Sequence, residues 1–307
     1  MGAVPVYRSG GRVARSAVKP PGATLIAIHS LQMFGILTRL DKYINRNRFS
    51  TRRASEAEVL ALIAKLKPVD CGIELIRIGG DRDGGYLVPD DLDGIEYCFS
   101  PGVSTIADFE NQLADRGIHS FLADYSVEAP PIARSEFTFD KKFLGATDRE
   151  SYFTLLTWKN KYLSGYSGDL LLQMDVEGAE YEVILNTPDD LLGQFRIAVI
   201  EFHFLDRLFE PLAFKILSAC FNKLLAQYHV VHLHPNNLYR PLMKGGVEVP
   251  LIMEATFLNK QRAAPLGPRV SFPHPLDADN LSSYPPLPLP ACWYAPSAGA
   301  VRPGPTT

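Results

Sequence analysis

The sequence predicts an α/β protein built on a seven-stranded sheet that is mostly parallel, with one antiparallel strand and helices on both faces. Short apolar runs alternate with helix-like segments along most of the chain, which is the rhythm of βαβ units joined by right-handed crossovers. Several of these runs end on an acidic or polar residue, as strands do when their carboxyl ends border a site. The last apolar run follows its predecessor without a helix between them, so that strand is expected to enter antiparallel.

Two helices are expected before the sheet. Residues 23–40 form an apolar run, but His29, Ser30, Gln32 and Thr38 interrupt it, whereas a membrane-spanning helix needs about 20 mainly apolar residues. We therefore expect an amphipathic or docking helix there, and no transmembrane segment. A second helix is expected over residues 55–66, where Ser55 as the N-cap and Glu58 three residues later form a capping box.

The remaining elements follow in order. Residues 72–88 are expected to form two short strands around the turn signal Asp83-Gly84-Gly85. The strands of the sheet are expected at residues 95–99, 120–123, 137–143, 169–174, 196–202, 230–234 and 251–258. Helices are expected at residues 106–116 (with Thr105 as the N-cap and Gly117 beyond the end), 149–162, 180–185 and 211–227.

Composition divides the chain into three parts. Residues 1–70 carry a net charge of +8, the rest of the chain carries −11, and residues 265–307 contain 11 prolines. We expect Trp293 and Tyr294 to pack part of this proline-rich stretch onto the body. The expected parts are a basic N-terminal extension (1–70), a folded domain (71–262) and a proline-rich tail (263–307).

Charge and cysteine usage limit the partners and the location. The acidic body argues against a nucleic-acid substrate, because phosphate contacts need a positive face. The basic start is typical of an organelle transit peptide or of weak contact with an anionic membrane surface, but we favour a solvated extension. Cys98 and Cys220 lie in apolar runs and are expected to be buried thiols. A reducing cytoplasm is therefore the expected setting.

The segment Leu170–Leu185 contains the most informative pattern. Its apolar run ends on Asp175, and a helix-like pattern follows. This reads as a buried parallel strand that delivers acids to its carboxyl end. Because Gly178 indicates a turn, Asp175 and Glu177 are expected to face the same cleft, whereas Glu180 is expected to cap the following helix.

A nucleotide-type cofactor site is expected beside this strand. Ser100 and Gly102 lie in the loop between an expected strand and an expected helix, where a cofactor can approach backbone amides and a helix N-terminus. Asp124 ends the next strand about twenty residues on, where such folds place an acid on ribose hydroxyls. The loop lacks the full G-x-G-x-x-G set, which argues against a nicotinamide-dependent oxidoreductase.

Histidines mark the ends of two later strands. Glu201 and His203 are alternate residues and so share a face of their strand. A carboxylate that orients an imidazole raises its basicity and gives a base suited to a hydroxyl acceptor. His232 and His234 repeat this spacing. Such residues also suit a divalent metal, but no ligand spacing is specific enough, so no metal site is predicted.

A resemblance to a known family rests on these motifs. The segment Asp175-Val176-Glu177-Gly178-Ala179-Glu180-Tyr181-Glu182-Val183-Ile184 resembles the signature of FkbM-type methyltransferases. The likeness covers roughly residues 72–290. It includes Arg77–Val88, Ile200–His203, His232–Asn237 and Pro250–Phe257.

The resemblance implies a class I methyltransferase (Rossmann-like) fold and S-adenosylmethionine as the cofactor. It further implies methyl transfer to a hydroxyl oxygen of a small molecule, either a sugar or a polyketide-like compound. The residues expected to bind the cofactor are Ser100, Gly102, Asp124 and Asp175, and those expected to act in catalysis are Asp175, Glu201 and His203. Asp175 would align the acceptor, accept its proton or stabilise the sulfonium, and these alternatives stay open.

Two questions stay open at the level of sequence. The Arg77–Val88 block is equally consistent with a lid or acceptor loop and with an ordinary hairpin. The alternative to an enzyme is a degenerate cofactor fold that serves as a scaffold or binding module in a biosynthetic assembly. The single glycine at Gly102 favours that alternative, and the acids and histidines at strand ends oppose it. The identity of the acceptor does not follow from the fold.

Overall fold

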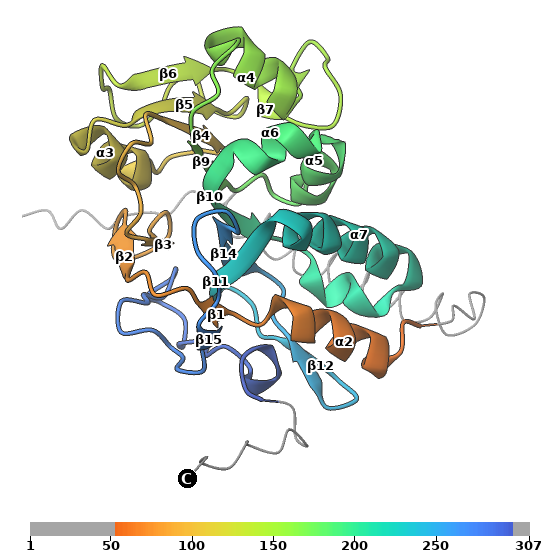
Figure 1. The fold of residues 1–307 in the computed structure, drawn as a ribbon. Helices are drawn as coiled ribbons and strands as arrows, with labels where there is room; N and C mark the ends of the chain where they lie inside the picture. The colour runs from red at the N-terminus through yellow and green to blue at the C-terminus, as the bar shows by residue number, and fades with distance from the viewer. Residues whose placement is uncertain (1–52, 297–307) are drawn as a thin grey trace, which may run out of the picture. The chain divides into compact units, whose positions relative to one another are not determined.

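The structure is a computed structural model that describes residues 53–296 (Figure 1). These residues form a mixed α/β fold around one seven-stranded sheet. The helix expected over residues 23–40 lies outside the described residues. In spatial order the strands are β11 (Tyr228–Pro235), β14 (Met253–Asn259), β10 (Phe195–Phe202), β9 (Leu170–Met174), β4 (Tyr97–Pro101), β5 (His119–Ala123) and β6 (Phe137–Asp140).

One strand of this sheet is antiparallel, as the sequence predicted. Every pair of neighbouring strands is parallel except the two pairs that include β14. Two short strands, β12 (Leu242–Lys244) and β13 (Val247–Val249), lie between β11 and β14 in place of a crossover helix. The sequence patterns did not predict this short hairpin.

The order of the strands shows where a ligand site is expected. When the strands are numbered by their order along the chain and listed from β6 to β11, they lie in the order 3-2-1-4-5-7-6. The first five positions agree with the doubly wound, Rossmann-like order. The chain reverses its direction across the sheet between β4 and β9. Ligands of such sheets bind beyond the carboxyl ends of the strands at this reversal. The residues that follow β4 and β9 are therefore the first to inspect.

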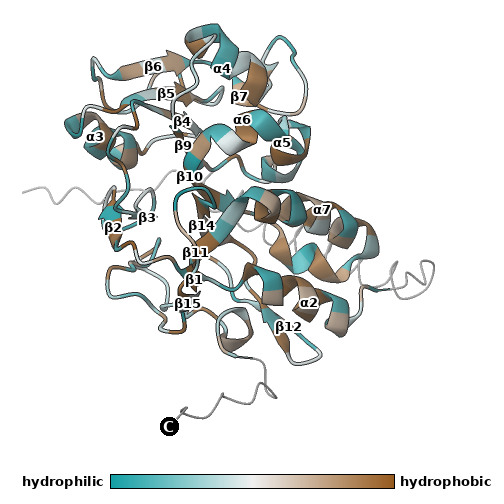
Figure 2. Cartoon of the chain, in the orientation of Figure 1, coloured by the Kyte–Doolittle hydropathy of each residue, from teal (hydrophilic) through white to brown (hydrophobic). Residues whose placement is uncertain are grey.

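Apolar side chains on the two faces of the sheet form two large cores, and Val103, Ala107 and Leu122 form a third, smaller cluster. On one face Phe99, Leu172 and Ala198 belong to the larger core. Its helices are α2 (Glu56–Leu66), α4 (Leu155–Leu163), α5 (Glu180–Asn186), α6 (Asp189–Gln194) and α7 (Pro211–Gln227). In Figure 2, α2 and α7 carry both apolar and polar residues, as helices with one buried stripe do.

The opposite face is covered differently. There the alternate strand residues Cys98 and Leu171 belong to the second core. This core also contains residues of α3 (Asp108–Asp115) and of the antiparallel pair β2 (Leu75–Ile78) and β3 (Tyr86–Pro89). Helices thus pack on both faces of the sheet, but a hairpin takes part of the second face. The described helices, within residues 53–296, include none long and apolar enough to cross a membrane.

The start of α2 agrees with the prediction, because both bonds of the capping box are present. The Ser55 hydroxyl accepts a hydrogen bond from the Glu58 amide (3.2 Å), and the Glu58 carboxylate accepts one from the Ser55 amide (2.8 Å). A capping box satisfies two backbone donors that the first turn leaves unpaired. Its residues therefore define this helix end locally.

Two other helix starts were predicted wrongly. The N-cap of α3 is Ala107 rather than Thr105, and Thr105 lies instead on a cavity wall. The helix α4 begins at Leu155 rather than at residue 149, because the preceding residues form β8 (Tyr152–Phe153), which pairs with β7 (Phe143–Leu144). At α4 the pairing of β7 with β8 outweighs the local helical pattern.

The C-terminal segment up to residue 296 packs against the body. Trp293, in the short helix η2 (Ala291–Trp293), is 1% exposed, and its indole Nε1 donates to the carbonyl oxygen of Glu248 (2.9 Å). The buried Asn280 donates from Nδ2 to Glu254 of β14 (2.6 Å) and to Asp83 of the β2–β3 turn (3.3 Å). The proline-rich segment thereby joins the hairpin to the antiparallel strand.

Candidate active site

A cavity of about 460 Å³ lies beyond the carboxyl ends of β4, β5 and β9. Three of the predicted site residues, Gly102, Asp124 and Asp175, line it. Its apolar walls come from Ile106, Phe109, Phe143, Leu144 and Tyr152, the β2–β3 turn contributes Asp83, and β3 contributes Tyr86. Ligand pockets usually measure about 300–1,000 Å³, so this cavity has the size of a small-molecule site.

Gly102 fixes the distance between the ends of the two central strands. Its φ angle is +92°, and a Cβ atom there would lie 1.6 Å from the carbonyl oxygen of Asp175. The Gly102 amide donates to the carbonyl oxygen of Ala123 (2.8 Å), and the Asp175 amide donates to that of Pro101 (3.3 Å). Only glycine combines this conformation with so close an approach.

Asp124 lies at the end of β5 and holds two loops. It is 5% exposed, and its Oδ2 accepts a hydrogen bond from the Ser104 amide (2.9 Å). Its Oδ1 accepts from the amide (2.7 Å) and the hydroxyl (2.6 Å) of Ser126. Because a carboxylate offers about four lone-pair sites, Asp124 keeps acceptor capacity on the side that faces the cavity.

Ser100 does not reach the cavity and instead forms part of a buried polar network. Its hydroxyl lies within hydrogen-bond distance of Glu110 Oε1 and of Gln173 Oε1 (2.7 Å). One hydroxyl hydrogen cannot serve two acceptors, so a neutral Glu110 that donates to Ser100 completes the network. Burial raises the pKa of Glu110 to about 7, in agreement with this arrangement.

The network reaches the cavity through residues that the sequence patterns did not single out. Gln173 Nε2 donates to the Tyr86 hydroxyl (3.3 Å), and both side chains, together with Glu110, line the cavity. Gln173 is the one polar residue within the strand β9. A polar residue inside an apolar strand was the available signal, since buried polar groups need partners.

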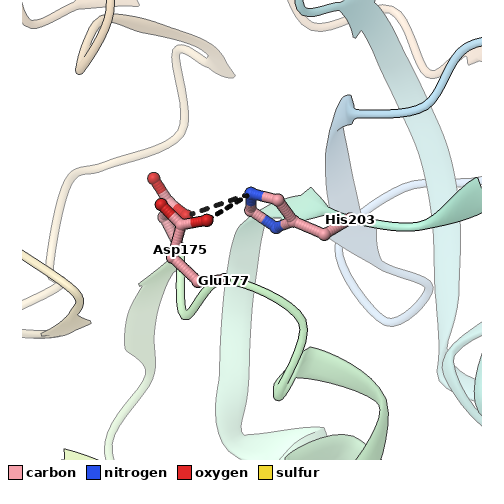
Figure 3. Close-up of side chains that lie close together, drawn as sticks. All are labelled: Asp175, Glu177 and His203. Atoms are coloured by element: carbon pink, nitrogen blue, oxygen red, sulfur yellow. Dashed lines mark ion pairs between the residues drawn. The ribbon is translucent and has the colours of Figure 1, made fainter. Parts of the chain in front are cut away.

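Asp175, Glu177 and His203 come together at the edge of the cavity (Figure 3). Nε2 of His203 is 3.4 Å from Oε2 of Glu177 and 3.9 Å from Oδ1 of Asp175. Glu177 has a φ angle of +54° and Gly178 one of +108°, so the chain turns where the sequence predicted a turn. Both carboxylates accordingly line the cavity.

Glu180 holds the imidazole in place, whereas Glu201 was expected to do so. Glu180 is fully buried, and its Oε1 accepts from the amides of Val176 (3.2 Å) and Gly178 (3.1 Å). The same oxygen lies 3.0 Å from Nδ1 of His203. Because the carboxylate accepts there, Nδ1 carries the hydrogen and Nε2 faces the two acids. Contrary to expectation, Glu180 does not cap α5, since the N-cap is Ala179 and has no side-chain hydrogen bond. It holds the preceding turn instead and orients His203.

These groups change one another's affinity for protons. Burial raises the pKa of Asp175 to about 7, and the carboxylates of Glu177 and Glu180 add to the rise while His203 opposes it. Burial lowers the pKa of His203, but the hydrogen bond and charge of Glu180 and the charges of the other two acids outweigh it. The pKa of His203 is therefore raised above its ordinary value, whereas that of Asp175 is raised to about 7.

Glu201 lies apart from the cavity wall. It is 4% exposed, its Oε1 accepts from Nδ2 of Asn236 (3.0 Å), and it pairs in register with Glu254 on β14. Burial and the charge of Asp175 raise its pKa. The structure thus brings His203 to the acids at the cavity and leaves Glu201 in the interior beside Asn236.

The second pair of histidines serves the C-terminal segment. Nε2 of His232 lies 2.8 Å from Oδ1 of Asp277, and Nδ1 of His234 lies 3.7 Å from the same oxygen. His234 also lines a separate cavity of about 320 Å³. These contacts agree with a structural role for both side chains.

Among the described residues that line the main cavity, acidic side chains are present and basic ones are not. Its lining includes the acidic residues Asp83, Glu110, Asp124, Asp175 and Glu177, and no Lys or Arg side chain is among the described residues that line it. An anionic pyrophosphate would meet repulsion here, since like charges that lack solvent oppose one another strongly. A cationic ligand would be attracted.

Comparison with known proteins addresses the same part of the chain. No curated protein matches the sequence. Residues 167–224 match the family model described as the Methyltransferase FkbM domain. This segment contains β9, α5, α6, β10 and most of α7, and hence Asp175, Glu180 and His203. The resemblance predicted from the sequence is confirmed there, and residues 167–224 are similar to the FkbM methyltransferase domain.

Proposed function

We propose that the chain is an S-adenosylmethionine-dependent O-methyltransferase with a class I fold, acting on a hydroxyl group of a sugar or polyketide-like small molecule. One observation carries the proposal. Gly102, Asp124 and Asp175 follow three neighbouring strands and line one cavity at the reversal of strand order. The segment that supplies Asp175 is the one that matches the FkbM methyltransferase domain.

The side chains of the cavity suit this cofactor. Asp124 has acceptor capacity for ribose hydroxyls, the role that an acid at this strand end takes in nucleotide-binding folds. The acids Asp175 and Glu177 suit a sulfonium cation because opposite charges attract. The apolar walls suit an adenine ring, and the absence of cationic side chains among the described lining residues opposes a dinucleotide.

The order of the strands separates the two ends of such a site. Asp124 follows β5, Gly102 follows β4, Asp175 follows β9 and His203 follows β10. Neighbouring strands lie about 4.8 Å apart, so this row spans about 14 Å. We place the ribose at the Asp124 end and the acceptor at the His203 end, so that the reaction takes place near Asp175.

S-Adenosylmethionine supplies a methyl group that is activated by bonding to a positively charged sulfur. The chain's own residues then have two tasks, because an in-line displacement depends chiefly on positioning. Asp175 and Glu177 hold the acceptor hydroxyl against the methyl carbon. Nε2 of His203, which Glu180 turns toward these acids, is the ring nitrogen available at this position when the imidazole is neutral.

Calorimetric titration with S-adenosylhomocysteine tests the proposal. We expect saturable binding to the full chain, at least tenfold weaker in Asp124→Ala. Asp190→Ala is the matched control, because it removes an exposed aspartate from the first turn of α6 and should bind normally. Methyl transfer to a panel of sugar and polyketide hydroxyls then identifies the acceptor.

The alternative, a scaffold without catalysis, has one structural observation in its favour. Both oxygens of Asp124 already accept hydrogen bonds from the chain itself. If the folded protein, verified by circular dichroism, does not bind S-adenosylhomocysteine at millimolar concentration, the scaffold role replaces the enzyme.

A further inference from the structure

The ends of β9 and β10 bring together three side chains that are suited to a metal ion. One oxygen of Asp175, one oxygen of Glu177 and one nitrogen of His203 all lie within 4.8 Å of one another (Figure 3). Two ligands about 2.1 Å from one ion, at a tetrahedral angle, are about 3.4 Å apart. The separations of Nε2 from the two carboxylates, 3.4 Å and 3.9 Å, require little movement to meet this geometry.

We propose that Asp175, Glu177 and His203 bind a divalent cation of the first transition row at the edge of the cavity. The role that we assign to the cation rests on the proposed methyl transfer, but its binding does not. Both carboxylates line the cavity, so the coordination positions that the protein leaves open face the space where an acceptor would lie.

The first support for this site is the way in which His203 is held. Its side chain is 7% exposed. Its Nδ1 is fixed by Glu180, which is itself held by two backbone amides. A histidine that binds a metal through one nitrogen almost always donates from the other to a carboxylate or carbonyl. Nε2 of His203 makes no hydrogen bond to the described residues and faces two carboxylates, so its orientation is that of a ligand.

The second support is an unsatisfied oxygen. Oδ1 of Asp175 is buried, and among residues 53–296 it has no hydrogen-bond partner. A buried acceptor without a partner costs about 1–3 kcal/mol, and more when it is charged. This is the same oxygen that lies 3.9 Å from Nε2 of His203. A cation between the two atoms would satisfy the oxygen and relieve the repulsion between Asp175 and Glu177.

The backbone of Glu177 gives the third support. Its φ angle of +54° lies in the left-handed region, which side chains other than glycine, asparagine and aspartate seldom adopt. Residues held in such conformations cost about 1–3 kcal/mol each and are concentrated at functional sites. Here the unusual conformation follows Val176 and brings the Glu177 carboxylate, whose side chain is 86% exposed, to 3.4 Å from Nε2 of His203.

The donor set selects the class of metal. Carboxylate oxygens suit magnesium, calcium and manganese, whereas imidazole suits iron, nickel, copper and zinc. One imidazole with two carboxylates favours an ion that accepts both kinds of ligand, and Mn²⁺ is a suitable probe. A bound cation lowers the pKa of an oxygen that it coordinates. The acceptor hydroxyl would therefore lose its proton to water, and its oxygen would bond to the methyl carbon as the carbon–sulfur bond breaks toward sulfur.

Electron paramagnetic resonance with Mn²⁺ tests the site without requiring activity. The full chain is stripped of metals with a chelator and titrated with MnCl₂, and the loss of the free-ion signal gives the dissociation constant. We expect one saturable site, weakened at least tenfold in Asp175→Asn and His203→Gln. Glu182→Gln and His229→Gln are the matched controls, since both residues lie outside the cluster, and they should bind as the unmodified chain does.

A measurement on the unmodified chain removes any dependence on how well the variants fold. Spin-echo spectra of bound Mn²⁺ should contain the modulation of a directly coordinated imidazole nitrogen. The proposal is overturned by the absence of saturable Mn²⁺ binding, by the absence of nitrogen modulation, or by equal weakening in the control variants. If S-adenosylhomocysteine binds but Mn²⁺ does not, the methyltransferase stands without a cation. If Mn²⁺ alone binds, the cation site stands and the methyltransferase does not.

Discussion

The α-carbon of Gly102 and the carbonyl oxygen of Asp175 are so close that a single added methyl group would lie 1.6 Å from that oxygen. This contact joins the strand that carries the expected cofactor loop to the strand that carries the expected catalytic acid. The ends of β4 and β9 can therefore lie this close at the centre of the site only because residue 102 is a glycine.

Gly102→Ala is expected to lower the free energy of unfolding by at least about 2 kcal/mol, because both the contact and the positive φ angle oppose a side chain. It should also abolish binding of S-adenosylhomocysteine. Denaturant unfolding gives the first quantity and calorimetry the second. Gly117→Ala is the control, because Gly117 has a φ angle of +77° and a Cβ atom added there would have nothing within 4 Å. Equal destabilisation by the two changes would show that the φ angle alone matters.

Glu110→Gln should change how stability depends on pH. Burial raises the pKa of Glu110 in the folded chain to about 7, above its ordinary value of 4.5. The stabilising effect of the neutral carboxyl is therefore complete below pH 4.5 and is lost as the pH rises through 7. Glutamine can donate to Ser100 at every pH. Relative to the unmodified chain, the variant should gain up to about 3 kcal/mol between pH 5 and pH 9.

Denaturant unfolding of both proteins across this pH range measures the effect of Glu110. The exposed Glu96 provides the control, as Glu96→Gln should leave the pH profile unchanged. A constant difference between Glu110→Gln and the unmodified chain would contradict a neutral Glu110.

His203→Gln should separate the acceptor step from cofactor binding. His203 does not line the cavity, so the affinity for S-adenosylhomocysteine should stay within about threefold of the unmodified value. The rate of methyl transfer should fall about 10²–10⁴-fold, because Nε2 is lost either as the base for the acceptor or as a ligand of the proposed cation. Steady-state kinetics with an acceptor from the screen measures kcat and KM separately. An unchanged kcat would remove His203 from the reaction.

Trp293→Ala should destabilise the whole described fold. Trp293 is 1% exposed in the larger core and donates to Glu248. Truncation of a buried tryptophan costs about 3–5 kcal/mol, whereas Tyr284→Ala, at a side chain that is 47% exposed, should cost less than about 1 kcal/mol. Thermal unfolding compares the two. A single cooperative transition with a lower midpoint is expected, and loss of a small separate transition would show that the segment folds independently.

The sequence predicted the sheet and the convergence of Gly102, Asp124 and Asp175 at one edge of it, and the reason is geometric. The carboxyl ends of parallel strands meet at one edge of a sheet whatever the side chains are. Residues that directly follow apolar runs therefore converge, as Gly102, Asp124 and Asp175 do at the cavity. The turn at Gly178 was predictable for a similar reason, since the conformational need is local.

The errors arose where the outcome depends on distant partners. Glu180 occupies a helix start that suits any acid, and only the fold shows that His203 lies beside it. Ser100 shares a face with the buried Cys98, and the alternation of the strand directs it into the second core rather than toward the edge. Glu201 likewise points into the interior, where Nδ2 of Asn236 donates a hydrogen bond to its carboxylate.

Asn280 has a consequence for how this protein can be recombined with others. Its amide group donates to both Asp83 and Glu254, and Asp83 forms part of the cavity wall. A chimera that joined residues 53–262 to a foreign C-terminal sequence would retain every strand of the sheet, yet it would lose the amide that positions this wall. The foreign sequence should therefore be joined beyond Trp293, so that the chimera keeps the proline-rich segment together with the site.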